Sequence, residues 1–308
     1  MDETEMEYGL DHAIAGKELK NYENLASFSL PLRDYVPSLN GFDICSKILP
    51  LHSLGGDMIA FIDFHRQYNL EKRIMMAANP DVQKQLQKNT RRLGILHADV
   101  EGHQRTDTVM NALLYRMFRL GVRYELEHNG HVTADLFENL NMEFFESTSI
   151  NKTISALYGE LYDSGKFRYL SAGVPYPVVF SKEQNRFVSL ANSSGRSLEN
   201  TSPLGMKPSS NHYEADKYKG NPLGFKEPYF VNEFSLQGAG DIMVLYSDGL
   251  GDHRMPDGTP YFPGLLELKL TGMNRASAKE ISDSITADLL HPDSKRKDDI
   301  SYIIIKKN

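Results

Sequence analysis

Residues 241–249 have the sequence DIMVLYSDG, a short apolar run that ends at Asp248 and a glycine. The length of this run and its β-branched and aromatic residues predict a buried strand. An aspartate at the edge of an apolar run recurs at three other places in the chain. These are Asp57, which follows a Gly-Gly pair and precedes MIAFIDF, Asp99 at the end of GILHAD, and the pair Asp298-Asp299 before ISYIII.

Carboxylates at the ends of neighbouring strands can converge at one edge of a sheet. Several of them without a basic residue between them repel one another unless divalent cations bind there. Oxygen ligands without thiolates favour Mg²⁺ or Mn²⁺ over zinc. Taken singly, the same residues are typical of ordinary turns, because Asp-Gly is a common hairpin corner and Asp-Asp before a strand is usually a solvated strand end. The residues alone therefore leave open a metal site or a set of turns.

The rest of the chain alternates between strand and helix patterns. Two helices are expected over residues 106–127 and 133–148, the first with Val109, Leu113, Met117 and Leu120 at helical spacing on a core-facing side. Residues 66–92 are polar and predict a helical excursion or flexible insert between two strands, and residues 191–230 predict a long loop. Strand-rich segments beside paired helices predict sheets covered by helices in one α/β domain of mixed order.

Composition narrows the class of protein. Of 308 residues, 40% are hydrophobic, which is typical of a globular chain that buries a core. Lys and Arg total 34 against 41 Asp and Glu, and this acidic balance argues against nucleic acid or an anionic membrane as partner. A single cysteine, Cys45, excludes an intrachain disulfide and a thiolate zinc cluster. The N-terminus is acidic, unlike the basic start of a signal peptide, and the apolar runs are too short to span a membrane. A cytoplasmic protein is therefore expected.

Five segments in order resemble one protein family, the SpoIIE-like (RsbU-type) bacterial branch of the PPM, or protein phosphatase 2C, metal-dependent Ser/Thr phosphatases. The resemblance covers about residues 40–306, with extra residues near 66–92 and 206–228. The segments are LHSLGGDMIAFIDF (51–64), HADVEGHQ (97–104), GELYDSGKFRYLSAGVPYPVVF (159–180) with SPLGM (202–206), GAGDIMVLYSDGLGD (238–252) and KDDISYIII (297–305).

The resemblance implies an α-β-β-α sandwich of two mainly antiparallel sheets flanked by helices, with two divalent cations, Mn²⁺ or Mg²⁺, at one end. Asp99 matches the acid that bridges both metals, and the backbone carbonyl of Val100 completes one coordination shell. Asp248 and Asp298 match the acids that hold the other metal, so the implied catalytic residues are Asp99, Asp248 and Asp298. Asp57 matches an acid at or near the second metal, in contact with it directly or through water.

Some positions depart from the family pattern. Ala60 replaces a second acid, Gln104 replaces a glycine, and Glu101 stands where a small or apolar residue is usual. These departures motivate an alternative, a catalytically weak or inactive binding module on the same fold that sequesters a signalling partner. A nuclease is a further alternative, against which the acidic composition argues.

The implied organisation is a polar, helical extension over residues 1–35, followed by a phosphatase domain over residues 36–308. The extension is expected to be a loosely held tail or a docking or dimerising helix, the latter giving a homodimer. The resemblance implies as substrate a phosphoserine on an anti-sigma-factor antagonist in a partner-switching pathway. The insert at residues 66–92 is expected beside the metal site, where it gates substrate or binds a regulator, or else is a surface excursion without a role.

Overall fold

The computed structural model describes residues 20–21, 30–31, 35–52, 55–102, 105–147, 152–195, 197–294 and 296–308. The predicted N-terminal extension, residues 1–35, lies almost entirely outside these ranges, as does Gln104. None of the helices in the described ranges is both long enough and apolar enough to span a membrane.

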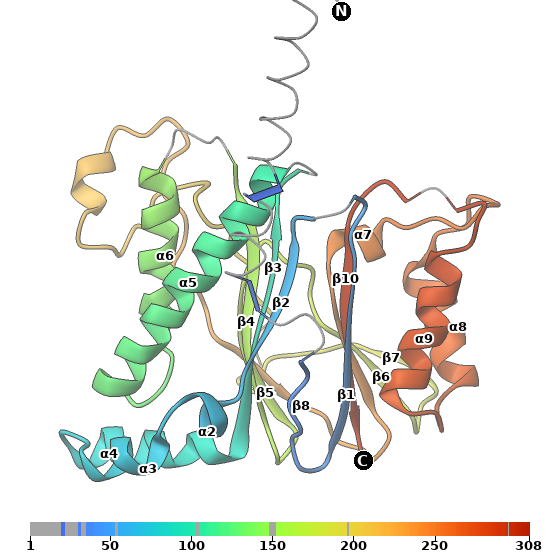
Figure 1. The fold of residues 1–308 in the computed structure, drawn as a ribbon, viewed down its shortest axis with the longest axis horizontal. Helices are drawn as coiled ribbons and strands as arrows, with labels where there is room; N and C mark the ends of the chain where they lie inside the picture. Colours follow the sequence, from blue (N-terminus) through green and yellow to red (C-terminus); the bar gives the residue numbers. More distant parts are fainter. Residues whose placement is uncertain are drawn as a thin grey trace, which may run out of the picture.

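Two five-stranded antiparallel sheets lie face to face (Figure 1). The first sheet has the order β1 (Phe42–Leu49), β10 (Ile300–Lys307), β9 (Ile242–Tyr246), β6 (Val178–Ser181) and β7 (Arg186–Val188). The second has the order β2 (Asp57–Ile62), β3 (Arg92–Val100), β4 (Ile154–Tyr162), β5 (Lys166–Ala172) and β8 (Asn232–Ser235). Runs of β-branched and aromatic residues, such as those in β9 and β10, favour strands that are buried on both faces.

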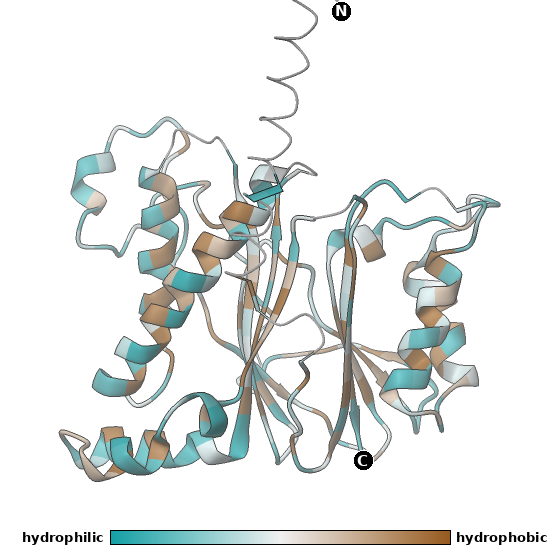
Figure 2. Cartoon of the chain, viewed as in Figure 1, coloured by the Kyte–Doolittle hydropathy of each residue, from teal (hydrophilic) through white to brown (hydrophobic). Residues whose placement is uncertain are grey.

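Helices cover both outer faces of this pair of sheets. The second sheet carries α5 (Arg105–His128) and α6 (Ala134–Glu146), and the first carries α8 (Leu266–Gly272) and α9 (Ala278–Leu289). Three hydrophobic clusters fill the resulting spaces, one between the sheets and one under each helix layer. In Figure 2 the helices α5, α6, α8 and α9 each carry both hydrophobic and hydrophilic residues, as helices with one buried face do. The predicted α-β-β-α sandwich is thus confirmed.

Helix α5 buries a different face from the predicted one. Leu113 is 48% exposed and Leu120 is 67% exposed, while Val109 and Met117 are partly buried. The neighbouring stripe packs against the second sheet instead, namely Met110, Leu114, Phe118, Val122 and Leu126. Both stripes are apolar at helical spacing, so periodicity alone did not distinguish them, and the prediction for this face was wrong.

The insert at residues 66–92 is helical, as one of the two predictions had it. It forms α2 (Phe64–Gln67), α3 (Leu70–Met75), α4 (Pro80–Lys88) and the short turn η1 (Asn89–Arg91). The β2–β3 ladder pairs Asp57 with Asp99 at one end and Ile62 with Gly94 at the other. The insert joins the strands at the Ile62 end, so the expectation that it lies beside Asp57 and Asp99 was wrong.

The long loop expected over residues 191–230 is present and is fastened to helix α6. It contains one short turn of helix, η3 (Ala215–Tyr218). Lys226 Nζ lies 2.6 Å from Glu138 Oε2 in a buried ion pair, and Tyr229 N donates to Glu138 Oε1 at 2.7 Å. Asn141 Nδ2 also donates to the carbonyl of Lys207 at 2.9 Å. The segment near 206–228 is therefore part of the folded body.

Candidate metal centre

Asp57 and Asp99 are directly paired across strands β2 and β3. They share the side of the sheet on which Ile59 and Ile95 pack between the two sheets, since alternate residues of a strand point to the same face. Asp57 is 8% exposed, and Asp99 is partly buried. The two carboxylates are thus held close together at the edge of the space between the sheets.

Asp248 and Asp298 come to the same end of the sandwich from the other sheet. Asp248 is the first residue of the short helix α7 (Asp248–Gly251), directly after β9, and Asp298 lies just before β10. Strands β9 and β10 are paired, with Tyr246 opposite Tyr302, so the end of one strand lies beside the start of the other. In Figure 1 the starts of β2 and β10 and helix α7 all lie toward the top of the sandwich.

The pKa values of Asp57 and Asp99 are both raised. Burial raises the pKa of Asp99 to about 10, assisted by the negative charges of Asp57, Asp248 and Asp298. Burial also raises the pKa of Asp57 to about 7, against the opposing effect of hydrogen bonds from Ser301 and Ser247. Without a counter-charge, the two paired carboxylates therefore resist being ionised together.

The loop before Asp57 is fixed by Asp299, which the sequence analysis had not given a role of its own. This buried carboxylate accepts hydrogen bonds from Leu51 N and Gly56 N, both at 2.5 Å. A side chain at Gly55 would overlap the Asp299 carboxylate, and a Cβ at Gly56 would lie 2.5 Å from the carbonyl oxygen of Val100. The two glycines are thus required by the close approach of two other chain segments.

Helix α5 holds the same loop from its other side. Asn111 Nδ2 donates to the carbonyl of Gly56 at 2.6 Å, and Val100 N donates to that carbonyl at 3.0 Å. The Val100 carbonyl therefore lies next to the Gly-Gly turn, on the same side of the site as Asp57.

A buried polar network that the sequence analysis missed joins the two sheets behind the aspartates. Ser247 Oγ donates to Asp57 Oδ2 at 2.9 Å and accepts from Ser301 N at 3.0 Å. Ser301 Oγ lies 2.7 Å from His97 Nε2, and burial lowers the pKa of His97 to about 4, so this imidazole is neutral at pH 7. The available signal was weak, since Ser247 adjoins Asp248 just after one apolar strand and Ser301 comes two residues after Asp299 at the start of another.

The residues present suit a hard divalent cation. All the candidate side-chain donors are carboxylate oxygens, and Asp57 Oδ1 is buried without a hydrogen-bond partner among the described residues. A cavity of about 20 Å³, large enough for one water-sized species, is lined by Asp99, Ser247 and Asp248 among others. Within the described ranges, no group of three or more His, Cys, Asp or Glu side chains is arranged so that it could hold a metal ion. The chemistry of the donor atoms therefore fits a divalent cation, although the carboxylates are not arranged around one point.

Ala60, where the family pattern has a second acid, faces away from this site. It is buried in the layer between the second sheet and its helices, together with Met58 and Ile62. Asp57 faces the opposite side of β2, so the alanine leaves the donor oxygens unchanged.

Comparisons with known proteins agree with this fold. Residues 89–308 match the family model for stage II sporulation protein E (SpoIIE). A comparison with curated protein sequences gives no match. The chain is similar in structure to the SiaA-PP2C domain of Pseudomonas aeruginosa, with 16% identity, a TM-score of 0.58, and coverage of 97% of this chain and 99% of that one.

Two further solved structures show the same fold. One contains the RsbU and RsbW domains of a Mycobacterium tuberculosis protein, with 20% identity and a TM-score of 0.55; the match covers 91% of this chain and 63% of that one, so this chain spans less than two thirds of its length. The other is RsbX in complex with magnesium, with 15% identity and a TM-score of 0.52, covering 89% of this chain and 99% of that one. Since the family model spans more than half of the sequence and the architecture agrees, the chain belongs to the SpoIIE-like family of PPM (protein phosphatase 2C type) phosphatases.

Proposed function

We propose that this chain is a protein serine/threonine phosphatase that depends on two divalent cations, Mn²⁺ or Mg²⁺. The observation that supports this most directly is the gathering of Asp57, Asp99, Asp248 and Asp298 from both sheets at one end of the sandwich. Carboxylates that lie opposite each other on paired strands are stabilised by bound cations, and PPM phosphatases are metal-dependent enzymes.

Each aspartate has a proposed role that follows the family resemblance. Asp99 would be a ligand of both cations, and the Val100 carbonyl would be a further ligand of one of them. Asp248 and Asp298 would hold the other of the two cations. Asp57 would bind at or near the second cation, directly or through water. When bound, two such cations lower the pKa of a coordinated water and offset the charge that develops on a phosphoryl group.

The chain's own residues prepare this chemistry by positioning the donors. Ser247 fixes one oxygen of Asp57 by hydrogen bonding and leaves the other free of protein partners within the described residues. Asp299 holds the Gly-Gly turn, which sets where β2 begins and thus where Asp57 lies. Asp248 is exposed at the rim, so a phosphorylated side chain displayed by another protein can approach the site.

We propose as substrate a phosphoserine on an anti-sigma-factor antagonist in a cytoplasmic partner-switching pathway. The family resemblance supports this choice, and a net charge of −7 without a basic stripe suits a protein partner better than a polyanion. Loss of the phosphate removes up to about two negative charges from the antagonist, which is enough to change its binding partner. A homodimer formed through the N-terminal extension remains part of the proposal.

The test is phosphate release from a kinase-phosphorylated antagonist and from p-nitrophenyl phosphate, each with Mn²⁺, with Mg²⁺ and with EDTA. The proposal expects release with either cation and none with EDTA. Tight binding of the phosphorylated antagonist without release under any condition would favour the alternative, a binding module that sequesters its partner. Release from generic phosphopeptides but from no antagonist would indicate a phosphatase of broad specificity.

A further inference from the structure

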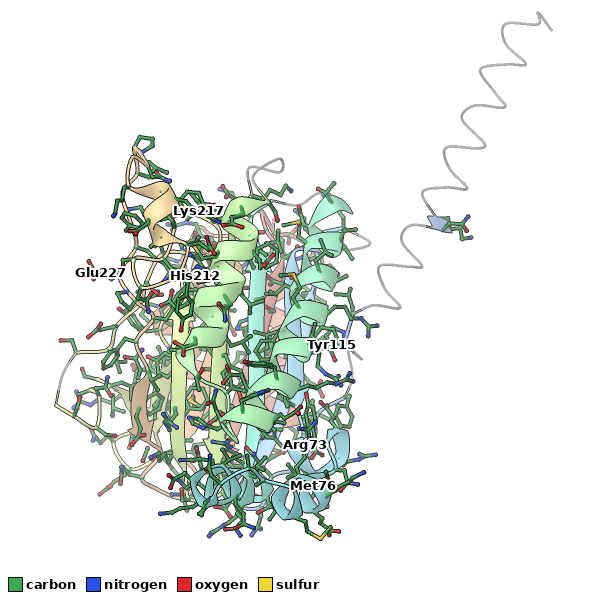
Figure 3. All side chains as sticks on the ribbon, turned by 90° about the vertical axis from the view of Figure 1, so that its left-hand side faces the viewer. Arg73, Met76, Tyr115, His212, Lys217 and Glu227 are labelled. Carbon is green, nitrogen blue, oxygen red and sulfur yellow. The ribbon has the colours of Figure 1, made fainter. Side chains whose placement is uncertain are left out.

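A second cavity lies at the end of the sandwich opposite to the four aspartates. It has a volume of about 430 Å³ and lies between the α2–α4 insert and the C-terminal part of α5. Small-molecule sites in proteins typically measure about 300–1,000 Å³. Figure 3 shows Arg73 and Met76, two of its lining residues, near the foot of α5, with Tyr115 farther along that helix. The cavity is therefore separate from the candidate metal centre.

The charges around this cavity are mainly positive, although the chain as a whole is acidic. Lys72, Arg73 and Arg123 line it, and the carboxylate of Glu127 is the acidic group among the lining residues. Within the described ranges, none of these three cations forms an ion pair. Two guanidinium groups and an ammonium group around one cavity favour a ligand with a compact double negative charge, as a phosphate group has.

The walls also contain the ring of Tyr68, which is largely buried. Tyr68 is 6% exposed, and its hydroxyl interacts with the guanidinium group of Arg119. The guanidinium groups of Arg73 and Arg119 lie 5.9 Å and 6.0 Å from the centre of its ring. Arg119 Nη1 also donates to the Tyr115 hydroxyl at 3.1 Å.

Gln67 adds an acceptor with a fixed orientation. Its Nε2 donates to the carbonyl of Phe61 at 3.1 Å, and its Oε1 is buried without a partner among the described residues. Since the amide nitrogen is engaged, the oxygen is the atom left for a donor on a ligand. Met76, Ala77, Leu86 and Leu126 add apolar surface to the walls, beside the polar side chain of Asn69.

We propose that this cavity binds a nucleoside monophosphate, that is, a small organic phosphate with a flat ring that carries an amino group. Lys72, Arg73 and Arg123 bind the phosphate, and the apolar walls with Tyr68 contact the base. Gln67 Oε1 accepts a hydrogen bond from the amino group of the base. The ligand does not reach the aspartates, so it is distinct from the phosphoprotein substrate, and the proposal does not depend on the proposed phosphatase activity.

The experiment is isothermal titration calorimetry of the full chain with AMP, GMP and CMP in EDTA, which keeps divalent cations from holding phosphate at the aspartates. Saturable binding of at least one of these nucleotides is expected. For that nucleotide, the parent nucleoside and inorganic phosphate should each bind at least tenfold more weakly. If none of the three nucleotides binds at millimolar concentration, or if phosphate alone binds as tightly, the proposal is overturned.

Variants locate the binding. Arg73→Gln and Arg123→Gln should each weaken nucleotide binding at least tenfold, with the fold unchanged by circular dichroism. Lys84→Gln is the matched control, because Lys84 is exposed on α4 of the same insert and does not line the cavity. Equal loss in the control, or wild-type affinity in both arginine variants, would overturn the assignment to this cavity.

Discussion

Asp57 and Asp99 occupy directly opposed positions of the antiparallel β2–β3 ladder, and both face the space between the two sheets. Opposed like charges destabilise a sheet unless something compensates for them. This pair therefore lowers the stability of the metal-free protein and favours the binding of a cation next to the two carboxylates.

Asp99→Asn should abolish cation-dependent phosphate release and leave the fold intact, because the change removes a charge but almost no volume. The measurement is phosphate release with Mn²⁺ alongside circular dichroism. Asp257→Asn, at an exposed turn position that is not among the candidate ligands, is the control and should keep wild-type activity. Wild-type turnover by the Asp99→Asn protein would contradict the proposed metal centre.

The neighbouring acids Asp298 and Asp299 should respond in opposite ways to the same substitution. Asp298→Asn should weaken Mn²⁺ affinity by roughly tenfold or more, with little change in the unfolding free energy of the metal-free protein. Asp299→Asn should lower that free energy by about 3 kcal/mol, because an amide cannot accept from both Leu51 N and Gly56 N. Urea denaturation in EDTA and Mn²⁺ titration separate the two effects, and identical profiles for the two variants would refute this division of roles.

Gly55→Ala should reduce both stability and activity, because its Cβ would overlap the Asp299 carboxylate and displace the turn before Asp57. Gly220→Ala is a matched control, since a Cβ there has no atom within 4 Å. Thermal unfolding and phosphate release are measured for both proteins. A Gly55→Ala protein that matches the Gly220→Ala protein in both assays would show that this turn tolerates a side chain.

Lys226→Met should destabilise the protein by about 3 kcal/mol, because it leaves the buried Glu138 carboxylate without its cation. Lys217→Met removes an ion pair with Glu214 on the exposed surface of the same loop and should leave the unfolding free energy unchanged within error. Urea denaturation of both variants gives the comparison. Equal stability of the two variants would mean that the loop is not fastened through Lys226.

The strands were the most predictable part of the fold. The strand that carries Asp99 and the strand that leads to Asp248 lie where short runs of β-branched and aromatic residues placed them. The gathering of the aspartates at one end was also expected, while their roles as metal ligands stay a prediction. Strand patterns are local, so a single sequence can reveal them.

What the sequence did not reveal depends on distant neighbours. Nothing near Asp299 indicates that it binds the backbone of residues 51 and 56, and nothing near Ser247 indicates its hydrogen bond to Asp57. The side of α5 that packs inward depends on which of two adjacent apolar stripes the sheet meets. The place of the 66–92 insert depends on the register of β2 and β3, which shows at which end the strands are joined.

The pairing of β1 with β10 has a consequence for how the protein is made. β1 is the first strand of the described chain and β10 the last, and β10 lies between the edge strand β1 and β9 in the first sheet. During synthesis β1 therefore cannot pair with β10 until the ribosome has made the last part of the chain. Contacts between residues so distant in sequence form late. The acids that precede β10 arrive at the same moment. A nascent chain can thus complete the second sheet early. It brings the four aspartates together only when β10 joins the first sheet.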